Sequence, residues 1–320
     1  MKLEQIYELN IELGIKNDLR GAEAARKQLK REREKYSKLS EDDKKDFDSE
    51  LLINPYTDSR LAYGDLKTDV KKVLAGIDME VAEVVIAKQL GDIDLVITHH
   101  PVGRSLTELD EQMHLQAEVL AGYGVPINIA EGVVRERIAT VMRKIHAGNN
   151  EQVVDNARLL NMPLLNAHTT CDNQAANFVK KALDKAKPVY VHEVMDALLE
   201  IPEYRIAKSM GIGPIISSGS ANNRCGKIAV TEFTGGTDGS QMMYEKMAQA
   251  GIGTVLSMHL GEESRKEAEK HHINVVVAGH MSSDSLGMNL FLDELEKKGV
   301  KIVPTSGLIR VSRNNKKSRK

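Results

Sequence analysis

Three stretches of the sequence share one pattern, in which an apolar run that predicts a β-strand ends in histidine. They are residues 94–101, 164–172 and 275–284, and the last two reach an aspartate four residues beyond the histidine. Imidazole nitrogens and carboxylate oxygens together form the ligand sets of many transition-metal sites. The sequence therefore predicts a centre with two metal ions. Its candidate ligands are His99, His100, Asp172, His280 and Asp284.

The adjacent histidines His99 and His100 need a special geometry to share one site. Successive side chains of a strand point to opposite faces, so a regular strand would separate the two imidazoles. Pro101 stops the strand and favours a turn from which both rings reach one cavity. Two nearby metal ions, one for each imidazole, fit this arrangement. His280 and Asp284 have the i, i+4 spacing of one helix face, from which the carboxylate could bridge both ions.

Asp172 completes a mixed nitrogen and oxygen set that suits zinc, manganese or iron, because imidazole favours transition metals and carboxylate offsets their charge. A plainer interpretation stands beside this one. A histidine at a strand end is often a hydrogen-bonded turn residue, and buried imidazoles need polar partners in any case. The same carboxylates could supply those partners as metal ligands or as simple hydrogen-bond acceptors.

A glycine-rich turn, Gly235-Gly-Thr-Asp-Gly239-Ser240, follows a predicted strand and opens a predicted helix. Backbone N–H groups and the helix dipole bind anions in such turns. Gly235, Gly236 and Ser240 are therefore candidates for holding a substrate phosphate. Glycine also occurs in strand-to-helix turns for steric reasons alone, and that alternative stays open here.

Two further histidines, His168 and His259, are candidates for carrying a proton near pH 7. With His259, the acidic residues Glu262 and Glu263 follow another predicted strand and could line the same cavity as partners of the ligands. The alternative places both glutamates in the first turn of an exposed helix, where the helix dipole favours acidic residues.

Short β-branched runs alternate with helix-like stretches from Val73 onward, which indicates an α/β fold. Functional residues of open α/β sheets gather beyond the carboxyl ends of the strands, so the three histidine-bearing stretches are expected to converge there. The predicted strands are residues 73–77, 95–98, 125–129, 164–167, 228–231, 254–257 and 275–278. The predicted helices are residues 81–90, 115–123, 133–146, 151–160, 175–185, 240–250, 262–271 and 286–298.

The composition is that of a soluble globular protein. The chain has 320 residues, 41% of them hydrophobic and 28% charged, and a net charge of -2 that gives no overall attraction to nucleic acid. No apolar run approaches the roughly 18 residues that a membrane span needs, and the N-terminus lacks the apolar region of a secretory signal. Cys171 and Cys225 are too few for a disulfide framework. The cytoplasm is the expected location.

Two terminal segments differ from the rest of the chain. Residues 1–50 are rich in charge and predict a helical N-terminal extension that packs on one face or contacts another subunit. Residues 311–320 predict a disordered basic tail, with nucleic-acid contact as the alternative. Residues 51–310 are then the metal-binding domain.

At the metal-binding motifs the sequence resembles the Nif-three-like dinuclear-metal-centre family, whose members are also known as GTP cyclohydrolase type 2 homologues. Among the family's ligands, His99, His100, Asp172 and His280 match directly, while Asp284 stands where the family usually has a bridging glutamate. The resemblance runs from about Asp58 to Arg310 and includes Asp58-Ser-Arg-Leu-Ala-Tyr-Gly64, Ile97-Thr-His-His-Pro101, His168-Thr-Thr-Cys-Asp172, Gly235-Gly236 and Gly279-His280-Met-Ser-Ser-Asp284. Where the family usually shows Thr-Gly-acid-x-x-x-His, this chain has residues 257–263, which implies a difference in substrate chemistry.

The resemblance implies a two-lobed mixed-sheet fold, with helices flanking the sheets and a metal site between the lobes. It also implies a homohexameric ring. We expect a metal-dependent hydrolase that acts on a nucleotide or another phosphate-bearing small molecule, with GTP ring opening as the named possibility. The alternative is a non-catalytic, metal-binding oligomeric scaffold or regulatory protein.

Overall fold

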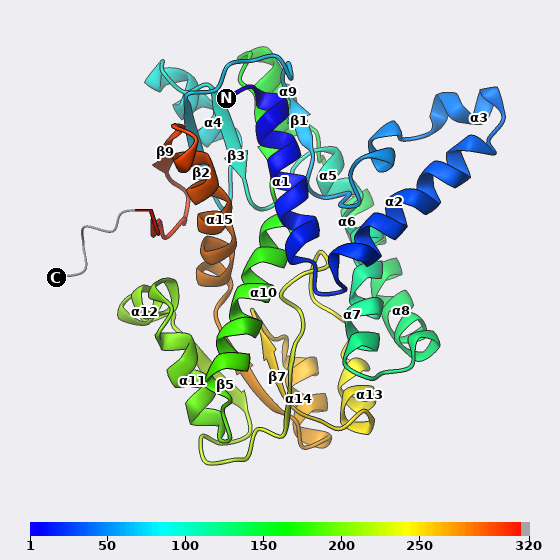
Figure 1. Ribbon diagram of the computed structural model, residues 1–320, viewed down its shortest axis with the longest axis vertical. Helices are drawn as coiled ribbons and strands as arrows, with labels where there is room; N and C mark the ends of the chain where they lie inside the picture. The colour runs from blue at the N-terminus through cyan, green and yellow to red at the C-terminus, as the bar shows by residue number, and fades with distance from the viewer. Residues whose placement is uncertain (315–320) are drawn as a thin grey trace.

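The computed structural model of the protein describes residues 1–314, which form two mixed β-sheets flanked by helices (Figure 1). This architecture confirms the predicted α/β class. In the first sheet the strand order is β1-β4-β3-β2-β9, and only β1 runs antiparallel to its neighbour. Its strands are β1 (Leu61–Tyr63), β2 (Lys72–Gly76), β3 (Leu95–Thr98), β4 (Leu164–Asn166) and β9 (Lys301–Pro304).

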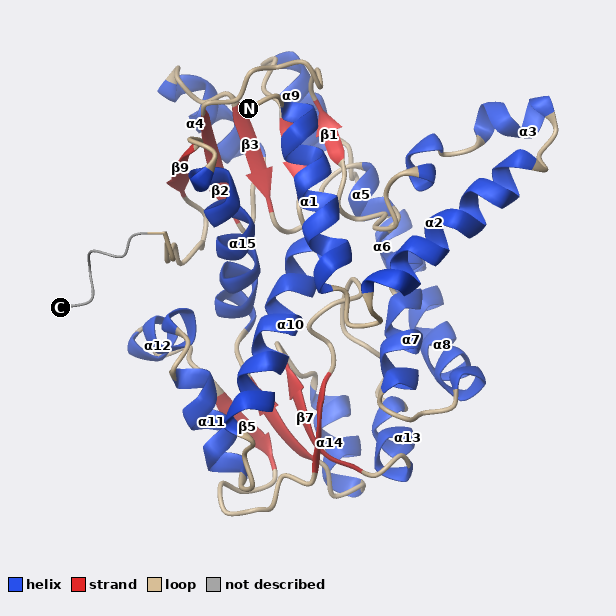
Figure 2. Ribbon diagram, viewed as in Figure 1, coloured by secondary structure: helices blue, strands red, loops and turns tan. Residues whose placement is uncertain are grey.

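The second sheet has the strand order β5-β8-β7-β6, and only β5 runs antiparallel to its neighbour. Figure 2 shows the two sheets at opposite ends of the molecule, with helices between them. We call each sheet with its flanking helices a lobe. The second-lobe strands are β5 (Ile215–Ser218), β6 (Lys227–Val230), β7 (Ile252–Ser257) and β8 (Asn274–Val277).

Two long helices cross between the lobes and begin where the sheets face each other. Helix α10 (Thr169–Ala186) follows β4 of the first lobe, and its later residues, including Val179, pack in the core of the second lobe. Helix α15 (His280–Lys297) follows β8 of the second lobe, and its later residues, including Phe291, pack in the core of the first lobe. Their first turns therefore share one region at the centre of the molecule.

The segment 125–129 was predicted to be a strand, and this prediction is wrong. Pro126 caps a helix that begins at Ile127, because its fixed φ suits a helix start and it offers no N–H group to a ladder. The remaining helices are α2 (Ala22–Ser37), α3 (Glu41–Asp46), α4 (Val81–Leu90), α5 (Arg104–Thr107), α6 (Leu109–Gln112), α7 (His114–Gly122), α8 (Ile127–His146), α9 (Gln152–Leu159), α11 (Val191–Leu199), α12 (Pro202–Ser209), α13 (Met243–Gln249) and α14 (Glu262–Lys270), with a short 3-10 helix at Ser49–Leu52.

The N-terminal 50 residues are helical but do not form one extension. Helix α1 (Leu3–Asn17) buries Leu3, Ile6 and Ile15 in the core of the first lobe, because these apolar residues recur along one face of the helix. Helices α2 and α3 instead project from the body (Figure 1), and Leu29 is the last residue of α2 that is buried. Helix α1 thus packs on the first lobe, and the charge-rich residues of this segment lie in α2 and α3.

The predicted basic tail begins in contact with the body. The Arg313 guanidinium donates two hydrogen bonds of 2.8 Å to the fully buried Glu203, so residues 311–314 are held against the second lobe rather than disordered. Residues 315–320 of that prediction lie outside the described residues. Among residues 1–314, no helix combines the length and apolar character needed to cross a membrane.

Candidate metal centre

The candidate site lies at the centre of the molecule, beyond the carboxyl ends of three strands. His99 and His100 follow β3 directly, and Asp172 lies in the first turn of α10, after β4. His280 and Asp284 lie at the start of α15, after β8. The parallel strands β3 and β4 end at the same edge of the first sheet, and β8 of the second sheet leads into α15, whose first turn lies in the same central region. The fold therefore brings all five predicted ligands together.

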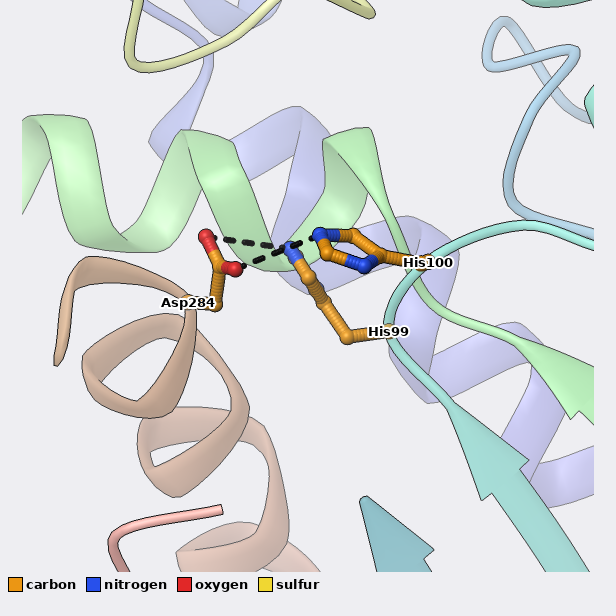
Figure 3. Close-up of side chains that lie close together, drawn as sticks. All are labelled: His99, His100 and Asp284. Atoms are coloured by element: carbon orange, nitrogen blue, oxygen red, sulfur yellow. Dashed lines mark ion pairs between the residues drawn. The ribbon is translucent and has the colours of Figure 1, made fainter. Parts of the chain in front are cut away.

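Asp284 occupies the middle of this cluster, and its side chain is almost fully buried. Its Oδ1 lies 3.4 Å from Nε2 of His99, and its Oδ2 lies 3.4 Å from Nε2 of both His100 and His280. Figure 3 shows the His99 and His100 rings turned toward this carboxylate. Because the two oxygens face different imidazoles, Asp284 has the arrangement of a carboxylate that can be shared by two cations.

Asp172 forms the second carboxylate of the cluster and links it to His168. Its Oδ1 lies 3.3 Å from Nε2 of His99, and its Oδ2 lies 3.8 Å from Nε2 of His168. The rings of His99 and His168 meet edge to face, with centroids 5.0 Å apart. His168 was predicted as a proton carrier, and the structure places its Nε2 atom among the predicted ligand atoms.

The imidazole rings of His99, His100 and His168 are each held by a hydrogen bond at Nδ1, on the side of the ring away from the cluster. His99 Nδ1 lies 3.1 Å from the carbonyl oxygen of Ala167, and His100 Nδ1 lies 2.6 Å from Oδ1 of Asp78. An outer acceptor on Nδ1 selects the tautomer whose Nε2 lone pair faces the cluster, as is usual for metal-binding histidines. Sequence reasoning gave Asp78 no role, because nothing in the local pattern pairs it with His100.

Asp58 plays the same part for His168. Its Oδ2 lies 2.8 Å from His168 Nδ1, and the hydroxyl groups of Ser59 and Thr169 donate to the same carboxylate at 3.0 and 2.6 Å. Asp58 opens one of the motifs shared with the resembling family, but its position in the sequence does not reveal this contact. The pairing depends on a tertiary approach of residues 110 positions apart.

The cluster is strongly coupled electrostatically. Burial alone would lower the pKa of His99, but the Asp284 and Asp172 carboxylates raise it well above its ordinary value. Burial alone would raise the pKa of Asp284, but the nearby imidazoles of His99 and His100 hold it well below its ordinary range. Burial lowers the pKa of His280, which lies on the outer side of the cluster. The Asp284 carboxylate is therefore ionised and available to a cation.

Three buried carboxylate oxygens in the cluster accept no hydrogen bond from residues 1–314: Oδ1 of Asp172 and both oxygens of Asp284. A buried acceptor without a donor is costly, so these atoms need a partner that the protein itself does not supply. Two groups of side chains have ligand atoms within 4.8 Å of one another and could hold a metal ion. They are His99, His100 and Asp284, and His99, His168 and Asp172. Their nitrogen and oxygen donors suit zinc, manganese or iron.

A small polar pocket of about 20 Å³ opens beside the cluster on the second-lobe side. His259, which follows β7, lies here with its ring centroid 4.9 Å from that of His280, and its Nδ1 is 2.5 Å from Oδ1 of Asp238. Glu262 and Glu263 do not line this pocket, because they pair with basic residues on the exposed face of α14. The lining residues are His168, Asp172, Glu232, Phe233, Thr234, Gly236, Thr237, Met258, His259, His280 and Asp284.

Glu232 is a pocket residue that sequence reasoning missed. It follows β6 and adopts a φ of 55°, which is unusual for a residue other than glycine. Burial raises the pKa of its carboxyl group. The group accepts hydrogen bonds from the Gly239 N–H at 2.9 Å and from the Tyr244 hydroxyl at 3.3 Å. Its place beyond a strand end is the one sequence signal that could have marked it.

The predicted anion-binding turn packs differently from expectation. Gly235 and Gly236 both have φ near 90°, and a Cβ at Gly235 would lie 2.8 Å from the side chain of Gln116. Gln116 also donates a hydrogen bond of 2.9 Å to the Gly235 carbonyl oxygen. The following helix begins at Met243 rather than at Ser240, so Ser240 is not the first residue of a helix. Steric packing accounts for these glycines, since Gly235 lies against Gln116 of α7 and Gly236 against Leu109 of α6.

The fold is similar to those of solved structures. A NIF3 superfamily protein from Sphaerobacter thermophilus is 31% identical in sequence, with a TM-score of 0.73 over 79% of this chain and 92% of that chain. Reduced HcgD from Methanocaldococcus jannaschii is 20% identical, with a TM-score of 0.50 over 77% of this chain and 88% of that chain, and shares the fold. No protein-family model and no curated protein matches the chain.

Proposed function

Since the chain belongs to the NIF3 superfamily, we propose that it is a metal-dependent hydrolase that uses a dinuclear centre to act on a nucleotide or another phosphate-bearing small molecule. The position of Asp284 carries this proposal. Its two oxygens face different imidazoles, so one carboxylate can serve two cations. His99 and Asp172 would hold one cation with Asp284, and His100 and His280 would hold the other.

The pair of cations would supply an activated water and would neutralise charge on a leaving or transferring oxygen. The residues that line the adjacent pocket include no lysine or arginine. An anionic substrate in this pocket would therefore have only imidazoles and cations to offset its charge. This shortage of basic side chains favours a reaction that depends on the metals over one in which the protein alone binds the phosphate.

His259 is the proton-transfer group that we assign to this reaction. It stands outside both groups of ligand atoms, it lines the pocket, and Asp238 fixes its ring through Nδ1. A carboxylate on one ring nitrogen leaves the other free to exchange a proton with a bound substrate. His168, the other predicted carrier, has its free nitrogen beside Asp172 instead.

A non-catalytic metal-binding scaffold is the second candidate, and burial favours it. His99, Asp172 and Asp284 are all at most 5% exposed, so a metal held there could serve the fold alone. The two candidates differ in what the outer part of the site does. A hydrolase must exchange ligands beside His280 and His259, whereas a scaffold need not.

The test is to reconstitute the protein with Zn²⁺, Mn²⁺ or Fe²⁺ and to measure hydrolysis of GTP, a dinucleotide and bis(p-nitrophenyl) phosphate. We expect His100→Ala to lose metal by elemental analysis, and His259→Gln to keep its metal while kcat falls about 100-fold. His146→Ala, at an exposed position of α8, is the matched control.

Unchanged metal content in His100→Ala would contradict the ligand assignment. Metal loss in that variant, with no hydrolysis of any probe by the wild type, would support the scaffold. Full activity in His259→Gln would remove this histidine from the reaction while leaving the metal centre in place.

A further inference from the structure

We propose that helix α3 of one chain docks into a charged cleft on a second copy of the same chain, and that the two copies exchange these contacts reciprocally. We call α2 and α3, which project from the body, the arm, and Figure 1 shows α3 at its outer end. The cleft lies between α2 and the helices α6, α7 and α8, and its volume is about 790 Å³. Among residues 1–314, no predicted metal ligand lines it, so the proposal does not depend on the proposed function.

The cleft has two walls of opposite charge. Lys27 and Arg31 lie four residues apart on one face of α2 and form the basic wall. Glu111 of α6 and Glu131 of α8 form the acidic wall. All four side chains are exposed, and none of them forms an ion pair with another residue of the described part of the chain. The cleft therefore suits a ligand that carries charges of both signs.

Helix α3 has the charge pattern that matches these walls. Its first turn, Glu41–Asp43, is acidic, and Lys44 and Lys45 follow in its last turn. Its internal ion pairs span three residues at 2.7 and 2.8 Å and are largely exposed, so they contribute little and can be exchanged at little cost. The acidic turn would face the basic wall, and the two lysines would face the acidic wall.

Helix α3 is well formed but packs on nothing in its own chain. The hydroxyl group of Ser40 accepts a hydrogen bond of 3.1 Å from the Asp43 N–H, and the rings of Tyr36 and Phe47 pack at its base with centroids 5.0 Å apart. None of its six residues is buried, and none lines the cleft of its own chain. Helices below about 12 residues are marginal in water without tertiary contacts, so a partner would supply what α3 lacks.

A second copy is the partner that this arrangement favours. Each chain has one α3 and one cleft of matching charge, so a two-fold axis lets both contacts form at once. The same α3 would reach its own cleft only if the arm folded back. Helix α2 is continuous, and Ala25 and Leu29 anchor its first half in the core of the first lobe, which opposes such a movement. Because the contact joins exposed charges, we expect it to weaken as salt is added.

The experiment mixes two full-length chains that each carry one new surface cysteine and measures the mixed disulfide after mild oxidation. Asp46→Cys lies at the end of α3, and Ile127→Cys lies in the cleft, where the native side chain is 45% exposed. A tag on one chain separates the mixed dimer from the others by mass. The native cysteines, Cys171 and Cys225, are buried and do not compete.

We expect a mixed disulfide at low salt that falls sharply at about 0.5 M NaCl, where exposed charges are screened. Leu159→Cys in α9 is the matched control for the cleft cysteine. Its native side chain is 83% exposed, so random collisions would cross-link it more readily than Ile127→Cys. A mixed disulfide no more abundant with Ile127→Cys than with this control would overturn the proposal.

Charge reversal tests the pairing itself. Lys27→Glu with Arg31→Glu in the cleft chain should lower the yield of mixed disulfide by about tenfold, because like charges would then meet across the contact. Glu41→Lys with Asp42→Lys in the α3 chain should restore it. A yield that the first pair leaves unchanged, or that the second pair fails to restore, would contradict the proposed contact.

A last variant separates exchange between copies from closure within one chain. When one chain carries both Asp46→Cys and Ile127→Cys, reciprocal exchange predicts disulfide-linked dimers. A disulfide confined to single chains, independent of protein concentration, would show instead that the arm closes on its own body, and the exchange would be ruled out.

Discussion

The buried side of the candidate metal centre and its more exposed side use the same kinds of ligand atom but differ in the residues that orient them. We call the buried side, with His99, His168 and Asp172, the closed position, and the exposed side, with His100 and His280, the open position. At the closed position, the fully buried Asp58 orients His168. At the open position, Asp78 orients His100, and Asp78 is 55% exposed. A buried hydrogen bond holds a side chain in place more firmly than a solvated one, because water competes for the exposed carboxylate. Burial thus distinguishes the two sides of the centre, although their ligand chemistry is the same.

The largest loss of metal affinity is expected when the carboxylate of Asp284, which faces both positions, is replaced. Asp284→Asn removes a charge and an anionic oxygen from both positions at once. We expect affinity at both to fall by more than the roughly 10–100-fold that loss of an outer hydrogen-bond partner costs. Calorimetry with Mn²⁺ measures this loss. Glu294→Gln, which alters an acid paired with Lys297 near the other end of α15, should bind as the wild type does. Selective loss at one position would show that Asp284 is not shared.

The second prediction concerns the contact that sets the distance between the two carboxylates. Gly287 of α15 packs on the backbone of Cys171 in α10, where an added Cβ would lie 2.8 Å from the Cys171 carbonyl carbon. Asp172 and Asp284 stand beside this contact, so Gly287→Ala must push the two helices apart. We expect a loss of about 3 kcal/mol in the free energy of unfolding, together with weaker binding at the closed position, where both carboxylates are needed.

Gly132→Ala in α8 is the matched control, since a Cβ there meets no atom within 4 Å. It should leave metal binding unchanged and stabilise the protein slightly, because alanine favours a helix interior over glycine. Urea denaturation and Mn²⁺ calorimetry report both quantities. A Gly287→Ala protein as stable as the wild type, with two unchanged binding events, would mean that the helix contact does not set the site.

The smallest effects on metal affinity are expected from substitutions of Asp58 and Asp78, the carboxylates that orient His168 and His100. Asp58→Asn should weaken the closed position by about 10–100-fold, since it replaces the carboxylate that fixes the His168 tautomer with a neutral amide. Asp78→Asn is its exposed counterpart and should weaken the open position by less than about tenfold, because water can replace the lost acceptor. Metal competition with a chelating dye resolves the two values. Equal effects at the two positions would speak against burial as the source of the asymmetry.

Much of the fold follows from local pattern. The run Leu95–Thr98 is buried at every position and stops shortly before Pro101, so its boundaries could be predicted closely. The strands that were missed, β1, β5 and β9, lie at the edges of the two sheets and are short and partly exposed. The conformation of an edge strand depends more on pairing with its one neighbour than on its own residues. Its local sequence therefore carries only a weak strand pattern.

The predicted ligands converge because each follows the carboxyl end of a strand or opens a helix there, and those are local properties. The roles of His168 and Asp58 could not be predicted in this way. Their contact joins residues 110 positions apart and exists only because β1, which Asp58 precedes, pairs with β4, which His168 follows. Glu232 escaped notice for a related reason, since its burial and its positive φ are set by the loop that closes over it.

The sequence by itself determined which side chains could bind metal and at which strand ends they would stand, because helix and strand periodicity act over a few residues. Only the tertiary structure decided that Asp284 faces imidazoles from both of its oxygens and that His168 joins His99 and Asp172 in one group of close ligand atoms. The unequal burial of the two positions results from the packing of α10 against α15. Burial is a property of neighbours distant in the chain, and no local pattern specifies it.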